Sequence, residues 1–427
     1  MVVFILLGLL VLFAAIGVPL AFAIGASSVS FLAIDAPQFL MILPQKLWGG
    51  AYSELLIALP LFMLAGELMN SGGITDRIIK FCLHLVRPIH GGLGEVNVVA
   101  SMIFGGITGS SVADTSALGS ILIPAMEKNG YSKSAASGIT VASSTMGMII
   151  PPSIPMIVYA MISGASISGL FIAGLVPGIL IGFSQIALVY IISRKKGWHP
   201  AKEKLNWGRF LKDFFYGLPA LIMPVLIVLS VSFGIATATE SAAIAAVYAL
   251  LLGFFVYREL TWKQVWRALK NAFKSSASIM LIVAITSIFT WILTMYQVPQ
   301  LIQGFFLGIN VPSWTIGLIF VLIILIFGTF IDVVPAITLL TPILYPVMTR
   351  LGFSPLQFGA MMITGLAIGL VTPPVGMCLN ACHRINKMPV MDIFKGAIPY
   401  VICNLIVLIA VTLIPALTTW LPTIISY

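Results

Sequence analysis

Two stretches of this chain carry the same spacing of glycine and proline residues, 222 positions apart. The matching positions are Gly106, Pro124, Met126, Gly130, Ser132, Gly147, Pro151 and Pro152, which fall on Gly328, Pro346, Met348, Gly352, Ser354, Gly369, Pro373 and Pro374. Leucine and isoleucine coincide easily in apolar sequence, whereas glycine and proline in register over about 50 residues indicate a true repeat. The neighbouring apolar runs pair at the same offset, so the repeating unit is about 140 residues long.

The apolar runs are those of a membrane protein. Hydrophobic residues make up 60% of the chain and charged residues only 8%, with a mean hydropathy of +1.11. An ordinary soluble domain carries about 25% charged residues. At roughly 20 apolar residues per crossing, there is room for about ten crossings. The first apolar run lacks a basic start and continues to Ala33, so it predicts a first span and no cleaved signal peptide.

The basic residues of the chain gather in loops and show that the repeat is inverted. Residues 194–213 hold seven basic side chains and residues 258–274 hold five, which is typical of cytoplasmic loops. The first copy ends at one of these loops and the second copy begins just after the other. Corresponding ends therefore lie on opposite sides of the membrane, with the N-terminus inside and the C-terminus outside. The net charge of +9 needs no nucleic-acid partner to explain it.

Each copy also contains a pair of helices that we expect to be too short to cross. The arms around residues 105–111 are about 13 to 16 residues, or roughly 20 to 24 Å as helix, against a hydrocarbon core of ~30 Å. We therefore predict re-entrant hairpins at 92–127, entering from the cytoplasm, and at 314–349, entering from outside. About nine crossings remain.

These features divide the chain into five parts. They are an N-terminal span and scaffold (1–52), a first inverted repeat (53–193), cytoplasmic loops with central scaffold spans (194–274), a second inverted repeat (275–415) and a C-terminal tail (416–427). The expected fold is an all-α polytopic membrane protein with inverted repeats and two re-entrant hairpins.

Four polar stretches rich in glycine or proline fall at the predicted membrane depth, namely 105–111, 143–153, 328–332 and 364–376. Non-helical backbone is tolerated there only when it is buried or lines a cavity, so these stretches should converge. A proline pair inside a helix frees upstream carbonyls, which suit a cation such as sodium, while half-helix N-termini favour an anion. We predict two symmetry-related sodium sites, each built from a hairpin tip and the facing helix break. Purely structural proline kinks are the alternative.

Two acidic residues stand out beside the predicted hairpin tips. Asp332 is the single formal charge between Ser275 and Thr349, and a carboxylate at such depth is a functional candidate. It either binds a cation or caps a helix. Asp114 either caps the second arm of the first hairpin or has a functional role. Nearby hydroxyl groups either bind the oxygens of an anion or bond to their own helices.

Other polar features favour structural interpretations. Thr237 and Glu240 have the spacing of a capping box at a helix start. The four cysteines, Cys82, Cys378, Cys382 and Cys403, lie in or beside apolar segments and are expected to be free packing residues. The chain has no HExxH, GxSxG or Walker motif, so we do not expect an enzyme.

Several longer motifs resemble the large membrane subunit (M, DctM-like) of tripartite ATP-independent periplasmic (TRAP) transporters. They are GELMNSGGITDRI (66–78), GGLGEVNVVASMIFGGITGSSVADTSALGSILIPAMEKNGY (91–131), ASSTMGMIIPPSIPMIVY (142–159), FIAGLVPG (171–178), TESAA (239–243) and GLVTPPVGMCLN (369–380). The resemblance covers nearly the whole chain. One departure is Met148, where the family often has a proline.

The resemblance implies a sodium-driven elevator carrier of the bacterial inner membrane. It would receive a small organic anion from a periplasmic solute-binding protein and work with a separate small Q-type membrane subunit. That subunit is not expected to be fused here, because the chain begins with the first span of the large subunit. Family substrates include C4-dicarboxylates, sialic acids, other sugar acids and sulfonates, and nothing in the sequence selects one.

The resemblance also implies which residues bind, with two or more sodium ions expected. The predicted sodium ligands are Thr108, Ser110, Thr145, Gly147, Gly328, Asp332, Gly365, Thr372 and Pro373. The predicted substrate-binding residues are Ser110, Ser111, Asp114, Ser143, Ser144, Pro151, Ser153 and Asn380. Two other functions remain open: a stand-alone sodium/carboxylate symporter, and a non-transporting scaffold subunit of a membrane complex.

Overall fold

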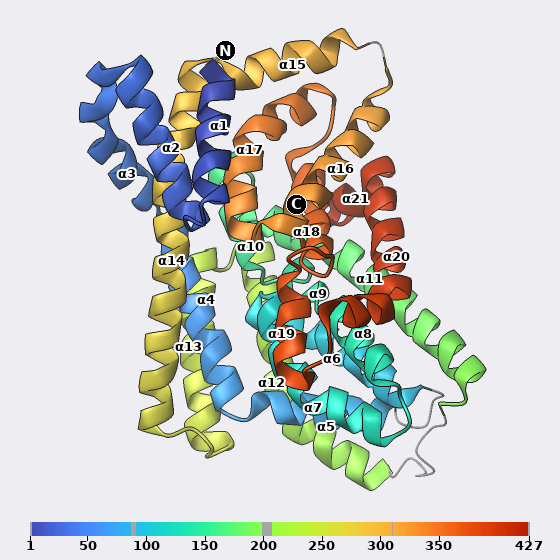
Figure 1. Cartoon of the computed structure of the whole chain (residues 1–427). Coiled ribbons are helices and arrows are strands. Elements are labelled where there is room, and N and C mark those ends of the chain that lie inside the picture. The colour runs from blue at the N-terminus through green and yellow to red at the C-terminus, as the bar shows by residue number, and fades with distance from the viewer. Residues whose placement is uncertain (1, 87–90, 199–206, 310, 426–427) are drawn as a thin grey trace.

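The computed structural model describes residues 2–86, 91–198, 207–309 and 311–425, and every regular element in these ranges is helical (Figure 1). The first repeat contains α4 (Glu54–Ser71), α5 (Ile74–Val86), α6 (Gly92–Thr108), α7 (Ser111–Lys128), α8 (Lys133–Ser143), α9 (Met146–Ile149), α10 (Ile154–Ser163) and α11 (Ile167–Lys196). The second contains α14 (Trp262–Met295), α15 (Val298–Gly308), α16 (Ser313–Phe330), α17 (Val333–Arg350), α18 (Pro355–Gly369), α19 (Met377–Asn386) and α20 (Val390–Leu413).

The remaining helices lie outside the repeats. They are α1 (Val2–Ala15), α2 (Leu20–Asp35), the 3-10 helix η1 (Pro37–Ile42), α3 (Leu43–Ala51), α12 (Trp207–Ser232), α13 (Ala238–Leu251), the π-helix η2 (Leu252–Val256) and α21 (Ala416–Ile425). The helices α2 and α3 pack against α14, and α13 packs against α4. These non-repeat helices thus surround the long helices that open each repeat.

The two repeats follow the same helix order and are inverted relative to each other. Each has a long helix, a shorter helix lying across one end of the molecule, a helical hairpin, a broken helix and a closing long helix. Figure 1 places α5 and the first hairpin toward one end, and α15 and the second hairpin toward the opposite end. The predicted all-helical fold with inverted repeats is confirmed.

The hairpin arms are longer than the sequence suggested. The first arm α6 has 17 residues and the second arm α7 has 18, where 13 to 16 were expected. Both arms of the second hairpin have 18. An 18-residue helix is about 27 Å long, still short of the ~30 Å core. Among the described residues, eight helices are long and apolar enough to span a membrane, and this number includes α16 and α17. Length alone therefore does not separate hairpin arms from spans.

Two terminal segments differ from the sequence-based expectation. The predicted first span is a pair of short packed helices, α1 and α2, because Gly17 adopts a left-handed backbone (φ +87°) and Pro19 follows it. Residues 416–425 of the predicted tail form α21, which packs against α11. Apolar sequence predicted burial in lipid or protein but did not reveal the tight turn.

Candidate functional site

The tip of the first hairpin contacts the break between α9 and α10. Gly109 turns the tip with a left-handed backbone (φ +61°), and a Cβ there would lie 2.9 Å from the carbonyl oxygen of Pro152. A Cβ on Gly147 would lie 3.2 Å from the carbonyl oxygen of Ser110. Glycine is needed at position 109 for its backbone conformation, and a side chain at position 147 would push the tip away, so these two glycines mark where the tip meets the break.

The second repeat makes the equivalent contact. A Cβ on Gly328 of α16 would lie 3.2 Å from the Cα of Gly369, the residue that ends α18. The backbone N–H of Val375, just after the second proline pair, donates to the carbonyl oxygen of Thr329 over 3.2 Å. The peptide bonds Pro151–Pro152 and Pro373–Pro374 are both cis. The four polar stretches therefore meet in two symmetry-related pairs.

A buried carboxylate lies beside the first tip. Asp114 is 0% exposed, and neither of its oxygens has a hydrogen-bond partner among the described atoms. Ser101 interacts with it electrostatically but not in hydrogen-bond geometry. The hydroxyl of Ser111 is also buried and unpartnered within the described part of the chain. The N-cap residue of α7 is Ser110, whose side chain accepts from the N–H of Ala113, and Asp114 lies in the first turn, where the helix dipole favours an anion.

Most other predicted hydroxyls bond to their own helix. Ser143, Ser144 and Thr145 donate to the carbonyls three residues earlier, at 3.1, 2.7 and 2.7 Å. The hydroxyl of Ser153 donates to the carbonyl oxygen of Met148 and accepts from the N–H of Met156, which caps α10. Thr108 lies at the tip, where its hydroxyl is 3.5 Å from the carbonyl oxygen of Phe104. These bonds match the back-bonding alternative and still leave hydroxyl lone pairs to face a ligand.

Three buried amides behind the first break were missed from the sequence. Asn97 donates to the hydroxyl of Thr140 over 2.5 Å, and Gln185 donates to the side-chain oxygen of Asn404 over 2.8 Å. Asn404 in turn donates to the hydroxyl of Thr145 over 3.1 Å. This network joins α6, α8, α11 and α20. A lone amide in an otherwise apolar helix is the sequence signal that would have revealed each member.

The second break has a more open surrounding. Asp332 caps α17 by accepting from the N–H of Val333 over 2.8 Å, and its side chain is exposed. The hydroxyl of Thr372 donates to the carbonyl oxygen of Ile368 over 2.8 Å. Asn380 donates to the carbonyl oxygen of Val375 over 2.7 Å, which ties α19 to the break. The helix-capping interpretation of Asp332 is thus observed.

Two residues of α18, Gly365 and Thr364, change the set of residues predicted for the second site. A Cβ on Gly365 would lie 2.7 Å from the side chain of Ile324, so Gly365 packs against α16 one turn away from the tip. The adjacent Thr364 is fully buried, and its hydroxyl has no partner among the described residues. Thr364 was not predicted, because a threonine in a helix is common and carries no signal by itself.

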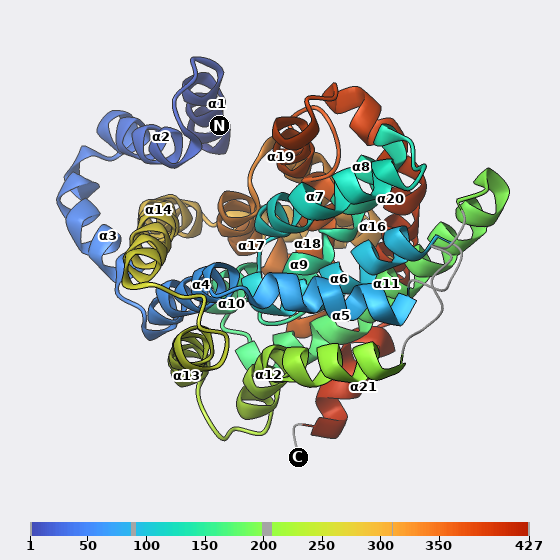
Figure 2. The same cartoon turned by 90° about the horizontal axis from the view of Figure 1, so that it is seen from below.

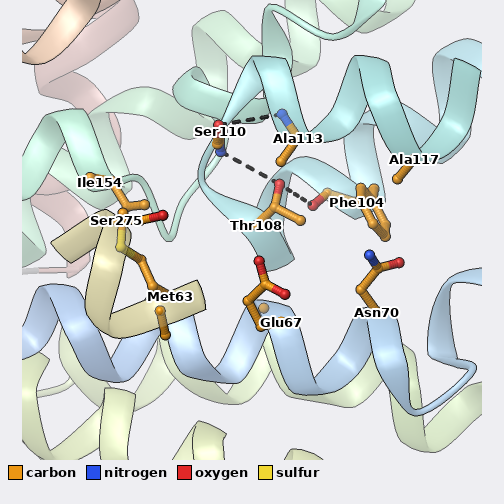
Figure 3. A pocket seen from close by; sticks show the side chains of 12 residues that line it. Met63, Glu67, Asn70, Phe104, Thr108, Ser110, Ala113, Ala117, Ile154 and Ser275 are labelled. Carbon is orange, nitrogen blue, oxygen red and sulfur yellow. Dashed lines mark hydrogen bonds between the residues drawn. The ribbon is translucent and has the colours of Figure 1, made fainter. Parts of the chain in front are cut away.

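A cavity of ≈160 Å³ separates the first tip from α4 and α14 (Figure 3). Figure 3 shows Glu67 pointing from α4 toward Thr108, and Asn70 toward Phe104. None of the described residues that line the cavity is basic, and Glu67 is the only charged one. The N-termini of α7 and α10 open on it through Ser110, Ala113 and Ile154.

A second cavity of ≈330 Å³ occupies the equivalent place in the other repeat. It is lined by Gly49, Gly50, Ser53, Met161, Ile162, Val283, Thr286, Ser287, Thr290 and Thr338. Adding 222 to Gly50 and Ser53 gives Ala272 and Ser275, which line the first cavity. The second cavity is also lined by α14, and the first cavity by α4, which is the equivalent helix of the other repeat. The inverted repeat therefore places one cavity toward each end of the molecule.

The cysteines and the second capping feature agree with the sequence. Cys82, Cys378 and Cys382 are buried and free, and Cys403 is free and half-buried. Thr237 and Glu240 form the predicted capping box at the start of α13. Neither feature contributes a ligand to the two tip contacts.

Comparison with known proteins assigns the chain to a family. The model of a family described as "Tripartite ATP-independent periplasmic transporter, DctM component" matches residues 7–417. The sialic acid TRAP transporter large permease protein SiaM of Vibrio cholerae is 36% identical over 95% of each chain. The 2,3-diketo-L-gulonate TRAP transporter large permease protein YiaN of Escherichia coli is 36% identical over 98% of each. The C4-dicarboxylate TRAP transporter large permease protein DctM of Vibrio cholerae is 35% identical, over 96% of this chain and 95% of its own.

A solved structure shares the fold. The YdaH transporter of Alcanivorax borkumensis superimposes with a TM-score of 0.64 at 15% identity, covering 91% of this chain and 89% of its own. At that identity the likeness concerns the fold alone. The family match over residues 7–417, together with relatives that are similar along nearly their whole length, shows that this chain is a multi-pass membrane protein of the TRAP transporter large permease family and not an enzyme.

Proposed function

We propose that this chain carries a small organic anion across the inner membrane together with sodium ions. The observation that carries the proposal is the pair of contacts between hairpin tips and helix breaks, with the unpartnered carboxylate of Asp114 beside the first. Ion-coupled transporters build their sites in this way, from unwound backbone at the centre of inverted repeats.

The first tip suits a cation. A fully buried ionised carboxylate without a partner costs several kcal/mol, so Asp114 either takes up a proton or is compensated by a positive charge. A sodium ion supplies that charge and accepts hard oxygen ligands. The carbonyl of Ser110 and the break backbone at Gly147 lie in contact, and the hydroxyl of Ser111 has an unused lone pair. We assign the first sodium ion to this group of residues.

The second tip offers a related set of oxygens. Thr329 and Val375 are joined across the contact, and the buried hydroxyl of Thr364 is unpartnered among the described residues. The accessible carboxylate of Asp332 caps the adjacent arm. We assign a second sodium ion to the contact between residues 328–332 and 364–376. Gly365 is not a direct ligand in this proposal, because it packs against Ile324.

The anion itself is held without a basic side chain. The described lining of the first cavity contains Glu67 and no lysine, arginine or histidine. The partial positive charges of the N-termini of α7 and α10 face this cavity, and bound sodium ions add to them. An anion therefore binds well only after sodium, which is the physical basis of coupling in this proposal.

The two cavities favour alternating exposure of one site to the two membrane faces. In the first repeat, the hairpin arm that packs against α4 is the first arm, α6, whereas in the second repeat the hairpin arm that packs against α14 is the second arm, α17. Equivalent helices thus make different contacts. If the first repeat adopts the packing now seen in the second, and the second adopts that of the first, both hairpins move relative to α4 and α14. Such a movement is an elevator mechanism. The second cavity, beside α14, then takes the place of the cavity in Figure 3 as the binding cavity.

The proposed partners follow from the family. We expect a periplasmic solute-binding protein to deliver the anion and a small Q-type membrane subunit to pack beside the non-repeat helices. One relative, the isethionate TRAP transporter permease protein DctMQ of Oleidesulfovibrio alaskensis, extends well beyond the matched part, which is 65% of its length. The named substrates of the relatives, including sialic acid, C4-dicarboxylate, 2,3-diketo-L-gulonate and isethionate, define the anion class to test. The expected cytoplasmic N-terminus does not fit this proposal, because α1 begins at the same end of the molecule as α15, the end that we place in the periplasm (Figure 1). We place the C-terminus in the periplasm.

The test is uptake into proteoliposomes that contain this chain and its small subunit. The four anion classes named above are supplied with their binding proteins, with and without an inward sodium gradient. Accumulation that requires the gradient supports the proposal, and equal uptake without it refutes sodium coupling. Uptake without any binding protein would instead indicate a stand-alone symporter. A chain that binds the small subunit but never transports would be a scaffold.

A further inference from the structure

Each repeat contains a corner where a long helix gives way to the shorter helix lying across one end of the molecule. The first corner is the turn at residues 72–73 between α4 and α5, and the second is the turn at residues 296–297 between α14 and α15. Gly73 (φ +75°) and Gln297 (φ +53°) both adopt left-handed backbone. The two corners lie at opposite ends of the molecule, at equivalent places in the inverted repeats (Figure 1).

The first corner is fastened by Arg77, in a cluster that we call the first clamp. Its guanidinium donates to the carbonyl oxygen of Gly73 over 2.6 Å and to the carboxylate of Glu259 over 2.8 Å. It also lies 4.0 Å from the ring centroid of Tyr257. The Arg77 side chain is 13% exposed and the Glu259 side chain 48% exposed, so the guanidinium is the shielded member of the pair.

The second corner is fastened by Tyr296, in the second clamp. The hydroxyl of Tyr296 donates to the carboxylate of Asp35, and its ring packs edge-on against Phe31 with 5.4 Å between centroids. Phe31 is fully buried, so the hydrogen bond closes a packed contact between α2 and the end of α14. The charged residues of the first clamp are Arg77 and Glu259, and the second clamp contains neither arginine nor glutamate.

The two clamps share one property that their chemistry does not explain. Glu259 lies between η2 and α14 in the central part of the chain, and Asp35 ends α2 in the N-terminal part. Both partners therefore lie outside the two repeats. The partners come from equivalent places, because adding 222 to Asp35 gives Tyr257, two residues before Glu259, and α2 packs against α14 as α13 packs against α4 (Figure 2). The side chains that make the two clamps nevertheless differ. A contact that is kept at both equivalent places, although its side chains differ, points to a shared mechanical requirement.

We infer that the two corners are stationary pivots, with Arg77 and Tyr296 as positioning residues that fix the bases of α5 and α15 to the non-repeat helices. This inference rests on the proposed movement of the hairpins. When the hairpins move relative to α4 and α14, α5 and α15 must transmit or absorb the motion. A helix can do so in a defined direction only if one of its ends is held. The non-repeat segments supply the holding residues.

The inference is tested by cross-linking each corner in the complex with the small subunit. Arg77→Cys/Glu259→Cys and Asp35→Cys/Tyr296→Cys are bridged with a flexible bismaleimide, with Cys403→Ser as the background. The control pair, Asn70→Cys/Ala117→Cys, spans the cavity between α4 and α7. Sodium-driven uptake of the anion that the parent complex accumulates is measured before and after bridging. In parallel, a charged maleimide reports the accessibility of Ser275→Cys with and without sodium.

A stationary corner predicts that bridged corner pairs keep most of their uptake and their sodium-dependent accessibility, while the bridged control pair loses both. Inhibition by the corner bridges as complete as in the control overturns the inference and leaves the transport proposal intact. If the bridged control pair keeps its uptake, the proposed movement of the hairpins is refuted, and the pivot inference that rests on it is refuted as well. The two failures are therefore distinguishable.

Point variants provide a second measurement. We expect Arg77→Gln to lower the maximal uptake rate about tenfold, the factor that a lost charge-assisted hydrogen bond commonly carries, without changing the half-saturating sodium concentration. The exchange Arg77→Glu/Glu259→Arg should recover much of the rate, because it restores the ion pair. A changed sodium dependence, or a rate that the exchange does not recover, contradicts a role limited to the corner.

Discussion

Asp114 places a carboxylate in the interior of the molecule where the described chain provides no hydrogen bond to either oxygen. The hydration lost by such a group is compensated either by a proton or by a bound cation. The neighbouring Ser111 hydroxyl is unpartnered as well within the described residues. At the scale of single residues, these two side chains are the strongest sign of a bound cation.

Asp114→Asn should therefore separate the charge from the shape of the side chain. In sodium-free buffer we expect the thermal unfolding midpoint of the variant to equal or exceed that of the parent, because the neutral amide needs neither a proton nor a cation to compensate its burial. Sodium at about 100 times its Kd should stabilise the parent by about 2.7 kcal/mol and the variant hardly at all. Uptake should be lost. An unchanged sodium response in Asp114→Asn would exclude this carboxylate from the ion site.

Asp332 offers a contrast, because its carboxylate has an observed structural role at the start of α17. Asp332→Asn keeps a good helix cap, whereas Asp332→Ala loses it at a cost of about 1 kcal/mol. If Asp332 also binds sodium, Asp332→Asn should raise the half-saturating sodium concentration without lowering the unfolding midpoint. Sodium-dependent uptake and thermal unfolding of the two variants make this comparison. Equal sodium dependence in Asp332→Asn and the parent would leave capping as the whole role.

Glu259 gives a pH-dependent prediction outside the membrane-spanning segments. The hydrogen bond from Arg77, with the nearby charges of Arg77 and Lys80, holds the pKa of Glu259 below its ordinary value of 4.5. The folded-state pKa is lowered, so the pair stabilises the fold above the unfolded pKa and loses this effect as pH falls through the folded pKa. The unfolding midpoint of Glu259→Gln should lie below that of the parent at pH 7, and the difference should shrink in acid. In an Arg77→Gln background the difference should be small at every pH.

At the scale of helices, the glycine pairs decide how closely hairpin and broken helix approach. A Cβ on Gly369 would lie 2.5 Å from the Cα of Gly328, and a Cβ on Gly105 would lie 2.9 Å from the Cα of Gly147. Both contacts join backbone to backbone, so no side chain can move aside. Small residues at such crossings are what lets membrane helices pack without a hydrophobic driving force.

Gly369→Ala should destabilise the protein by about 1 to 3 kcal/mol, the usual cost of overpacking a rigid contact. Gly304→Ala in α15 is the matched control, because a Cβ there meets open space. The control should be neutral or gain up to about 1 kcal/mol from helix propensity. Unfolding midpoints in detergent test both variants. A tolerated Gly369→Ala would mean that hairpin and broken helix are not held at backbone distance.

At the scale of the whole molecule, the inverted repeats assign opposite membrane faces to equivalent parts. The end that carries α19 should face the cytoplasm, and the end that carries α15 should face the periplasm. Arg384 and Gln300 are exposed on these two helices and are suitable reporters. The orientation follows from the clustering of basic residues in loops on one side.

A membrane-impermeant maleimide should label Gln300→Cys in spheroplasts and Arg384→Cys only in inverted vesicles. The native cysteines interfere little, because three are buried and Cys403 is half-buried. Labelling of both positions from the same side would contradict the inverted arrangement in the membrane. Reversed labelling would keep the inversion and reverse the orientation.

The sequence by itself determined the repeat, its inversion and the pairs of stretches that meet, because glycine, proline and charge each constrain the backbone locally. Gly328 and Gly369, for example, were identified from spacing alone and lie in backbone contact. The approximate helix order followed for the same reason. The sequence could not determine that the chain turns back at Gly17 within residues 2–35, since an apolar stretch fits one membrane span or a pair of packed helices equally well.

Only the tertiary structure decided which polar groups are left without partners. Asp114, which the sequence placed in the first turn of a helix, is buried and unpartnered because Ser110 is the N-cap residue and α6 and α8 pack against α7. The amides Gln185 and Asn404 meet across 219 residues of sequence, and Arg77 meets Glu259 across 182. Such contacts depend on how distant helices pack in three dimensions, and no local pattern in the chain encodes them.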